Sequence, residues 1–322
     1  MAGGTVTQRV TVVGAGVIGA SWTALFLAHG LHVTVCDIAP DSEARLHTQL
    51  RAIEPTLHAL GLPPLDTSHL LFEPHISKAV VAADVVQECG PERRGFKRDL
   101  WRRVEQAAPP QALLLSSSSG IPVDWQSTRM RDPARLLIGH PVNPPHLMPL
   151  VEVVAGSKTA STAVDEAIDF YRAVGKHPVR LRKPIPGFVV NRLQSALMRE
   201  AVALVRAGVV TVDELDDIVT HSVGPRWAAT GPFESFHLGG GPTGFAGFLK
   251  AYAGGMQLLW LHSSLRPVWF TPSVRRRLRE QVDAGIGTVS ITELEARRDR
   301  RQLAVLRASR ETTAMEEGSS RV

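Results

Sequence analysis

The sequence predicts an α/β protein in which a Rossmann-type domain with a mostly parallel sheet is followed by an all-helical C-terminal domain. Short β-branched strands alternate with helical stretches over about the first 185 residues, which is typical of a parallel sheet covered by helices on both faces. After residue 190 the apolar residues follow helical spacing and no segment reads as a strand. We therefore expect two domains, residues 1–185 and 186–322, with a polar and disordered end from about residue 312.

The first domain opens with a β-branched strand at Arg9–Val13, followed by a helix at Ile18–His29. A second strand covers Leu31–Cys36. Another helix starts near Ser42, because leucine and isoleucine recur there every three or four residues, and Gly61 with two prolines ends it. Five further short apolar strands follow: Val85–Glu88, Ala112–Leu115, Arg135–Ile138, Leu150–Val154 and Pro178–Leu181. The order of elements is that of a parallel sheet.

The second domain shows helix starts in place of strands. Thr211 with Glu214, and Ser290 with Glu293, fit the capping box, in which each side chain accepts from the backbone N–H of the other residue. These pairs predict two helix N-termini.

The composition is that of a soluble globular protein. Of the 322 residues, 44% are hydrophobic and 21% charged, which allows a full core. No stretch reaches the roughly 20 apolar residues of a membrane span, so we expect no membrane insertion. Two cysteines, Cys36 and Cys89, indicate a reducing, cytoplasmic location. The charge of +5 is spread over mixed-sign runs without a nucleic-acid motif, so no nucleic-acid partner is expected.

The first strand leads into a glycine-rich turn typical of dinucleotide binding. The turn has the pattern GxGxxG and contributes Gly14, Gly16, Val17, Ile18 and Gly19. Such a pattern is specific where it joins a strand to a helix and an acid ends the next strand, as Asp37 does here. The helix N-terminus attracts phosphate, and Asp37 would bind ribose hydroxyls and repel a 2′-phosphate. We therefore expect NAD; a flavin or a purely structural turn is the alternative.

Polar residues also lie where later strands end. Ser116–Ser119 closes one strand, His140 closes the next, and Glu152 lies on another. Strand ends in such a sheet converge on the ligand crevice, where a histidine can exchange a proton with a substrate hydroxyl and a carboxylate can stabilise the imidazolium. A structural histidine and an ordinary polar loop are the alternatives. His140 and His146 lack a familiar metal-ligand spacing, so we expect no metal site.

Taken together, these motifs resemble the 3-hydroxyacyl-CoA dehydrogenase superfamily. The resemblance rests on the glycine turn, the serines, His140–Pro145 with Glu152, and Pro186–Arg192, in the family's order. Residues 140–145, 224–228 and 231–234 look closest to the lambda-crystallin / L-gulonate 3-dehydrogenase branch. The resemblance implies an NAD-dependent enzyme that acts on the 3-hydroxyl of an L-gulonate-like 3-hydroxy acid, reversibly, and a homodimer formed through the helical domain.

The family motifs also imply roles for single residues. His140 matches the general acid/base, Glu152 its partner, and Ser119 the serine that contacts substrate and nicotinamide, with the register within the four serines uncertain by one. The other matching residues are Asn143 near the nicotinamide, Glu92 and Lys97 around the cofactor, and Asn191 completing the active site. For Glu92 and Lys97, an ordinary helix-surface pair is the alternative.

Arg226 bears on the class of substrate. The gulonate branch and the related carnitine dehydrogenases resemble this chain in having arginine followed by an aromatic residue. A guanidinium can bind a free carboxylate through two hydrogen bonds, which a thioester cannot accept in the same way. This favours a free hydroxy or keto acid; a structural ion pair is the alternative for Arg226.

Three other functions stay open. They are a 3-hydroxyacyl-CoA dehydrogenase of the 3-hydroxybutyryl-CoA type, a biosynthetic β-keto reductase, and a non-catalytic crystallin-like or NAD-sensing protein. The joint presence of Ser119, His140, Glu152 and Asn191 favours an enzyme.

Overall fold

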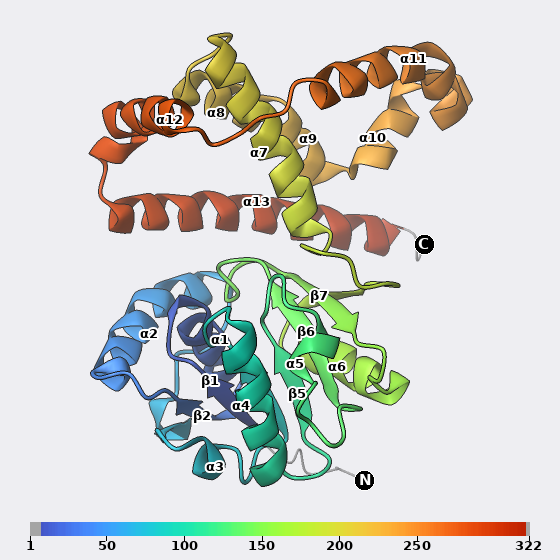
Figure 1. The fold of residues 1–322 in the computed structure, drawn as a ribbon. Helices are drawn as coiled ribbons and strands as arrows, with labels where there is room; N and C mark the ends of the chain where they lie inside the picture. Colours follow the sequence, from blue (N-terminus) through green and yellow to red (C-terminus); the bar gives the residue numbers. More distant parts are fainter. Residues whose placement is uncertain (1–7, 320–322) are drawn as a thin grey trace. The chain divides into compact units, whose positions relative to one another are not determined.

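The computed structural model describes residues 8–319, and the chain divides into two compact units, the first ending at Arg192 and the second beginning at Leu193 (Figure 1). None of the described helices is long and apolar enough to cross a membrane.

The first unit contains one eight-stranded sheet. Its strands are β1 (Arg9–Val13), β2 (His32–Cys36), β3 (Leu70–Phe72), β4 (Val85–Glu88), β5 (Leu113–Ser116), β6 (Leu136–Pro141), β7 (Leu150–Ala155) and β8 (His177–Arg180). Their spatial order is β3-β2-β1-β4-β5-β6-β7-β8. All neighbours are parallel except β6 and β7, which form an antiparallel pair. The expectation of a Rossmann-type, mostly parallel sheet is confirmed.

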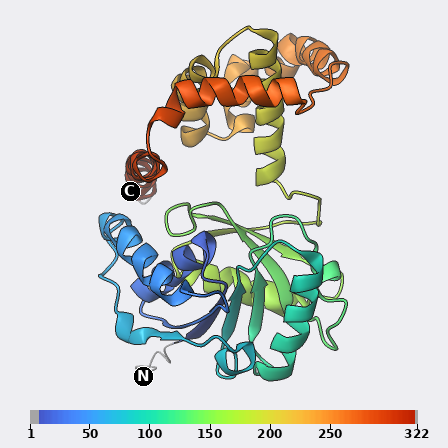
Figure 2. The ribbon, with the colours of Figure 1, turned by 60° about the vertical axis from the view of Figure 1, so that its left-hand side comes forward.

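Helices cover both faces of this sheet (Figure 2). They are α1 (Val17–Ala28), α2 (Ser42–Ala59), α3 (Ile76–Ala79), α4 (Arg94–Ala107), α5 (Val123–Gln126) and α6 (Ser161–Ala173). Two apolar cores result, because successive strand residues point to opposite faces. Val85 of β4 packs with α1, α2 and α6, whereas the next residue, Val86, packs with α3, α4 and α5. The strand ends are thereby held at one edge by well-packed layers.

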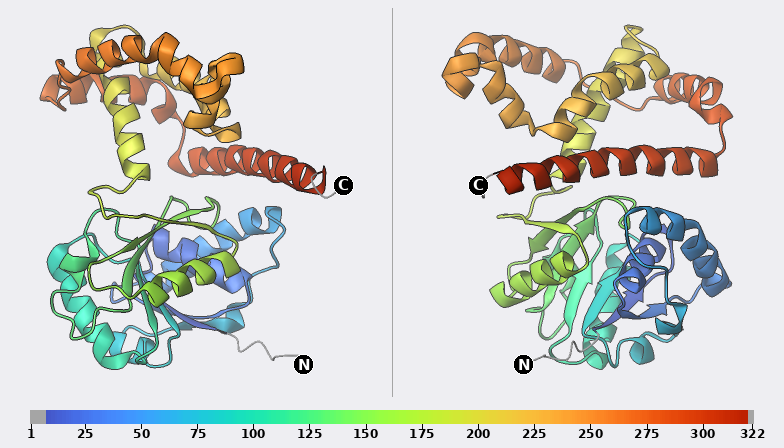
Figure 3. Two further views of the ribbon diagram at one scale, coloured as in Figure 1. Left: turned by 90° about the vertical axis from the view of Figure 1, so that its right-hand side faces the viewer. Right: turned by 180° about the vertical axis from the view of Figure 1, so that it is seen from behind.

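The second unit is helical throughout its described residues. Its helices are α7 (Val190–Ala207, which starts within the first unit), α8 (Val212–His221), α9 (Val223–Ala229), α10 (Pro232–Gly239), α11 (Gly244–Ser264), α12 (Pro272–Ala284) and α13 (Ile291–Ser319). Within this unit, α10 and α11 lie together at one end and α12 at the other (Figure 3). The all-helical expectation is confirmed for this region.

The predicted helix starts are formed. Thr211 caps α8, since its hydroxyl accepts from Glu214 N and its own N–H donates to the Glu214 carboxylate. Ser290 Oγ accepts from Glu293 N at the start of α13. The structure assigns helix as far as Ser319; residues 320–322 of the end expected to be disordered lie outside the described residues.

Candidate active site

The histidine and the glutamate singled out by the sequence lie directly opposite each other on neighbouring strands. The antiparallel register of β6 and β7 pairs His140 with Glu152, and His140 Nδ1 lies 2.8 Å from Glu152 Oε2. Both side chains are buried. Residues directly opposite in such a pair have adjacent side chains, so the strand register itself forms the dyad.

The second oxygen of Glu152 is bound by the segment that leaves the sheet. Glu152 Oε1 accepts from the backbone N–H groups of Val189 and Val190 at 2.8 and 3.1 Å. The preceding residues, Gly187 and Phe188, have φ values of +75° and +50°. A positive φ is rare for a bulky residue such as phenylalanine. The Phe188 ring is buried, and its centroid lies 5.4 Å from the centroid of the His140 ring. This turn directs both amides to the carboxylate.

These contacts keep Glu152 ionised. Burial alone would raise the pKa of Glu152, but the hydrogen bonds from His140, Val190 and Val189 outweigh it and lower the pKa below its ordinary value. An ionised carboxylate accepts the Nδ1–H of His140, which leaves Nε2 as the ring nitrogen available for proton exchange. The dyad is therefore arranged for general acid/base chemistry.

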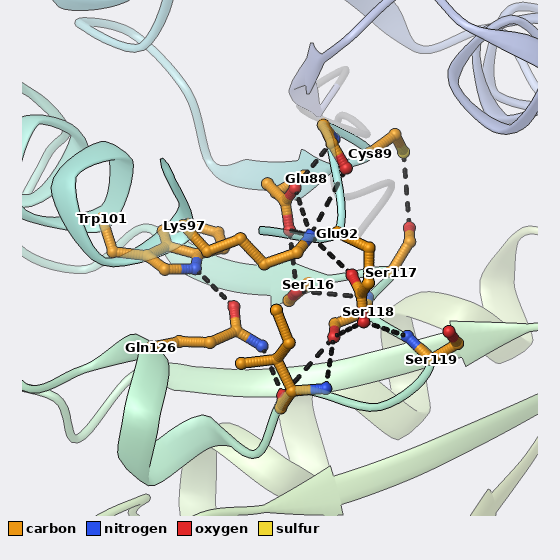
Figure 4. A network of polar contacts seen from close by, with 12 residues as sticks. Glu88, Cys89, Glu92, Lys97, Trp101, Ser116, Ser117, Ser118, Ser119 and Gln126 are labelled. Carbon is orange, nitrogen blue, oxygen red and sulfur yellow. Dashed lines mark hydrogen bonds and ion pairs between the residues drawn. The ribbon is translucent and has the colours of Figure 1, made fainter. Parts of the chain in front are cut away.

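The four serines at the end of β5 and directly after it, Ser116–Ser119, have different surroundings (Figure 4). The first three hydroxyls are each bonded within the unit: Ser116 to Glu88, Ser117 to Gln87 and Ser118 to Glu92. Ser119 is exposed, and its hydroxyl makes no hydrogen bond to the described part of the chain. Its carbonyl accepts from Asn191 Nδ2 at 3.4 Å. The geometry favours Ser119 as the serine that faces a ligand, and it brings Asn191 next to it.

Glu92 and Lys97 do not form an ordinary surface pair. Lys97 is 1% exposed and its Nζ lies 2.6 and 2.7 Å from the two carboxylate oxygens of Glu88. Glu92 accepts at Oε1 from the N–H groups of Ser119 and Gly120. Glu88 was not among the predicted site residues, although it is an acid that ends an apolar strand and precedes Cys89 and Gly90.

The glycine turn has room for a pyrophosphate at one position only. A Cβ at Gly14 would lie 2.8 Å from the Cys89 carbonyl oxygen, and one at Gly19 would lie 1.8 Å from the Gly14 oxygen. A Cβ at Gly16, in contrast, would meet nothing within 4 Å. Helix α1 starts at the exposed Val17, so its first N–H groups lack partners within the helix. The turn fits a dinucleotide.

Asp37 lies at the end of β2, beside this turn. Its Oδ2 accepts from Ala15 N at 2.7 Å and its Oδ1 from Ala39 N at 2.8 Å. The carboxylate is thus held in place and partly exposed at the position where an adenosine ribose is bound in such domains.

We predict that the protein binds NADH more tightly than NADPH, because the Asp37 carboxylate repels a 2′-phosphate. Asp37→Ala should weaken NADH binding and strengthen NADPH binding, while Glu43→Ala, at an exposed acid of α2, should change neither. Titration of nicotinamide fluorescence measures the six affinities of the wild type and the two variants for the two cofactors. Equal affinity of the wild type for both cofactors would contradict the role of Asp37.

Asn143 is exposed in the loop between β6 and β7. Two buried anchors that the sequence analysis did not find hold this loop. His146 bonds Ser21 of α1, through its N–H at 2.7 Å and its Nδ1 at 2.8 Å, and the Lys176 ammonium donates to the carbonyl of Pro145. The loop that carries Asn143 is therefore tied to the helix that follows the glycine turn.

Arg226 lies in α9 of the second unit. Its side chain is exposed, and no ion pair or side-chain hydrogen bond to it occurs within the described residues. The alternative of a structural ion pair therefore finds no partner there, and the guanidinium is available to an external anion.

Comparison with known proteins gives the family of each part of the chain. Residues 9–184 match the NAD binding domain of 3-hydroxyacyl-CoA dehydrogenase, and residues 187–258 match its C-terminal domain. An L-carnitine dehydrogenase of Streptomyces coelicolor is 42% identical over 307 residues, covering 94% of this chain and 95% of that protein. A 3-hydroxyacyl-CoA dehydrogenase of Gibberella moniliformis is 38% identical over 313 residues, covering 96% and 97%.

A solved structure is also similar over nearly the whole chain. It is the 5-dehydrogenase of 5-formyl-3-hydroxy-2-methylpyridine 4-carboxylic acid, described as an NAD⁺-dependent dismutase, with a TM-score of 0.80, 31% identity and coverage of 94% of this chain and 98% of that one. None of these names is that of the lambda-crystallin / L-gulonate 3-dehydrogenase branch favoured by the motifs.

Proposed function

The chain belongs to the 3-hydroxyacyl-CoA dehydrogenase family of NAD-dependent enzymes, and on this premise we propose that it oxidises the 3-hydroxyl of a small free 3-hydroxy acid, reversibly, to the 3-keto acid. L-Carnitine is the first candidate substrate and L-gulonate the second.

The dyad supports the proton-transfer half of this reaction. His140 Nε2 takes the proton of the substrate hydroxyl in oxidation and returns it in reduction, while Glu152 stabilises the charged ring. The hydroxyl of Ser119 and the amide of Asn191 hold the substrate oxygen through hydrogen bonds that strengthen as carbonyl character develops. NAD⁺, when bound, would accept the hydride of the substrate on its nicotinamide ring. The glycine turn with Gly16 and Asp37 would hold it, together with Asn143 and Glu92, and the buried Lys97 would contribute through Glu92.

The free guanidinium of Arg226 is the observation that carries the choice of substrate class. L-Carnitine and the pyridine carboxylic acid named for the structural relative both contain a free carboxylate. Arginine binds a carboxylate through two parallel charged hydrogen bonds, whereas a thioester offers no such pair of anionic oxygens. A free acid is therefore favoured over a CoA ester.

A substrate panel tests the proposal. NADH formation is measured with L-carnitine, L-gulonate and 3-hydroxybutyryl-CoA, and we expect the highest kcat/KM for a free acid. A preference for 3-hydroxybutyryl-CoA over every free acid would instead identify an acyl-CoA dehydrogenase, the second candidate, which the Gibberella relative's name favours. Reduction of bulky β-keto compounds alone would point to a biosynthetic reductase. NADH binding without any turnover would indicate a non-catalytic sensor.

We also propose that the chain forms a homodimer through its helical domain. Helix α11 has 21 residues and one charged side chain, Lys250, and six large apolar residues on it are exposed: Leu249, Tyr252, Leu258, Leu259, Trp260 and Leu261. A helix that is apolar on all sides is normally buried, and most soluble oligomers are symmetric assemblies of one chain. A second copy is therefore the occupant that we propose for α11.

Light scattering after size exclusion tests the dimer. We expect a mass twice that of the 34.9 kDa chain, and a shift toward the single-chain mass in Trp260→Glu. Leu71→Glu, at an exposed apolar residue of β3 in the first unit, is the control and should leave the mass unchanged. A wild type that elutes at the mass of one chain would contradict the proposal.

A cytoplasmic location is part of the proposal. Both cysteines, Cys36 and Cys89, are free. Burial raises the pKa of Cys36 to about 11 and that of Cys89 to about 12, so both thiols stay protonated at neutral pH. Free, unreactive thiols are consistent with a reducing compartment.

A further inference from the structure

We propose that Glu88 is a positioning residue for the active-site serine: through Lys97 and Ser116 it holds the loop of residues 116–121 in the register in which Ser119 alone presents its hydroxyl. The inference rests on the proposed function, in which Ser119 contacts the substrate oxygen. Glu88 itself is completely buried, so its role would be exerted through the residues that it binds.

Four hydrogen bonds converge on the Glu88 carboxylate (Figure 4). Lys97 Nζ donates to both oxygens, at 2.6 and 2.7 Å, Gly90 N donates to Oε1 at 2.7 Å, and Ser116 Oγ donates to Oε2 at 2.7 Å. A buried charge is costly unless a partner compensates it, and here each charge is the partner of the other. The pair thus forms a fixed unit where β4, β5 and α4 meet.

From this pair the contacts continue to the loop through Glu92. Lys97 Nζ also lies 3.4 Å from Glu92 Oε2. The other oxygen, Oε1, accepts from Ser118 Oγ at 2.5 Å, from Ser119 N at 3.2 Å and from Gly120 N at 3.0 Å. Glu92 is 41% exposed, so on its own it would be free to change rotamer. The ammonium that Glu88 fixes is what orients Glu92 toward the loop.

The other end of the loop is held from the same helix. Trp101 of α4 donates to Gln126 Oε1 at 2.8 Å, and Gln126 Nε2 donates to the Ile121 carbonyl at 2.8 Å. The Ile121 N–H in turn donates to Ser118 Oγ at 2.9 Å. Since this end does not depend on Glu88, loss of Glu88 should loosen the part of the loop around Ser119 and leave the rest attached.

Removal of the Glu88 charge has a specific physical consequence. In Glu88→Gln the Lys97 ammonium stays buried without its counterion, and the nearest remaining carboxylate is Glu92. Lys97 would then draw Glu92 away from Ser119 N and Gly120 N. A charged hydrogen bond lost at such a site corresponds to about a ten- to hundredfold change in the opening equilibrium.

The experiment compares Glu88→Gln, Lys97→Met and the double variant with Thr11→Val as the control. Thr11 is buried in β1 and donates to the Ala79 carbonyl at 2.7 Å, so this control also loses one buried hydrogen bond, away from the loop. Hydrogen–deuterium exchange of a peptide spanning residues 117–121 is measured without cofactor or substrate. We expect about ten- to hundredfold faster exchange in Glu88→Gln and wild-type exchange in the control.

Turnover is measured in the same variants. The rate is divided by the concentration of NADH-binding sites, so that misfolded protein does not lower the value of kcat. We expect kcat to fall in Glu88→Gln, and the double variant to lose no more than the worse single variant, because residues that act as one unit are not additive. If Glu88→Gln does not fold, the same exchange measurement is made on the double variant. That variant removes both the Glu88 and the Lys97 charge, so neither is left buried without its partner.

Unchanged exchange in the folded Glu88→Gln variant would overturn the proposal, as would additive losses in the double variant. Faster exchange in a protein that turns over no hydroxy acid would support the positioning role and refute the proposed function, so the two failures are distinguishable.

Discussion

Replacement of His140 by alanine is expected to lower kcat by about 10²–10⁴, which is the usual contribution of a general acid/base. The affinity for NADH should stay nearly unchanged, because the residues that we propose for the adenosine and pyrophosphate of the cofactor, the glycine turn and Asp37, are not altered. Steady-state kinetics and a fluorescence titration of NADH measure the two effects separately. Near wild-type turnover in His140→Ala would remove the dyad from the mechanism.

Glu152→Gln is the matched variant for this test. The amide oxygen can still accept from His140 Nδ1, but it cannot stabilise a positive ring, so the loss in kcat should be smaller than in His140→Ala. The pH profile of oxidation should also change, because the ionised carboxylate that faces His140 is removed. A structural role alone would not produce this change.

Arg226→Met is expected to raise KM for free 3-hydroxy acids about ten- to a hundredfold, the value of a lost charged hydrogen bond to the substrate carboxylate. Turnover of an acyl-CoA ester, if any, should be nearly unaffected. NADH affinity should not change, because the residues that we propose for the cofactor belong to the first unit and Arg226 to the second.

Two controls define the Arg226 result. Arg275→Met removes an exposed arginine of α12 in the same unit and should leave KM unchanged. Arg226→Lys keeps the charge but loses the planar fork, so its KM should lie between those of the wild type and Arg226→Met. An unchanged KM for every free acid in Arg226→Met would assign this side chain a structural role instead.

Most of the first unit could be predicted from local patterns, and its two departures have physical causes. Strand β3, Leu70–Phe72, has three residues, too few to show a period, and it exists through its pairing with β2. The antiparallel direction of β7 was not predicted either. It could have been, because the loop of residues 142–149 is shorter than the crossover of a dozen or more residues that parallel neighbours require.

The site divides in the same way. The residue types of His140 and Glu152 themselves indicate acid/base chemistry. The N–H groups that bind Glu152 are backbone groups of two valines, and the residue type valine does not predict such a contact. The positive φ of Phe188 could not be predicted from its residue type, because positive φ is typical of glycine and not of phenylalanine. The register of the serines depends on partners such as Glu88, which are brought near only by the sheet.

The direct pairing of His140 with Glu152 across two strands has a consequence for how such an enzyme diversifies. The pair that we propose for proton transfer is set by the register of β6 and β7, and the eight residues that connect the strands contribute neither partner. The connection can therefore be shortened, lengthened or exchanged while the pair survives, whereas a slip of one residue within either strand would turn one partner to the opposite face. The proposed proton transfer and the proposed cofactor contact of Asn143 are thus separable in this chain, open to change at different rates and to loop grafting in the laboratory.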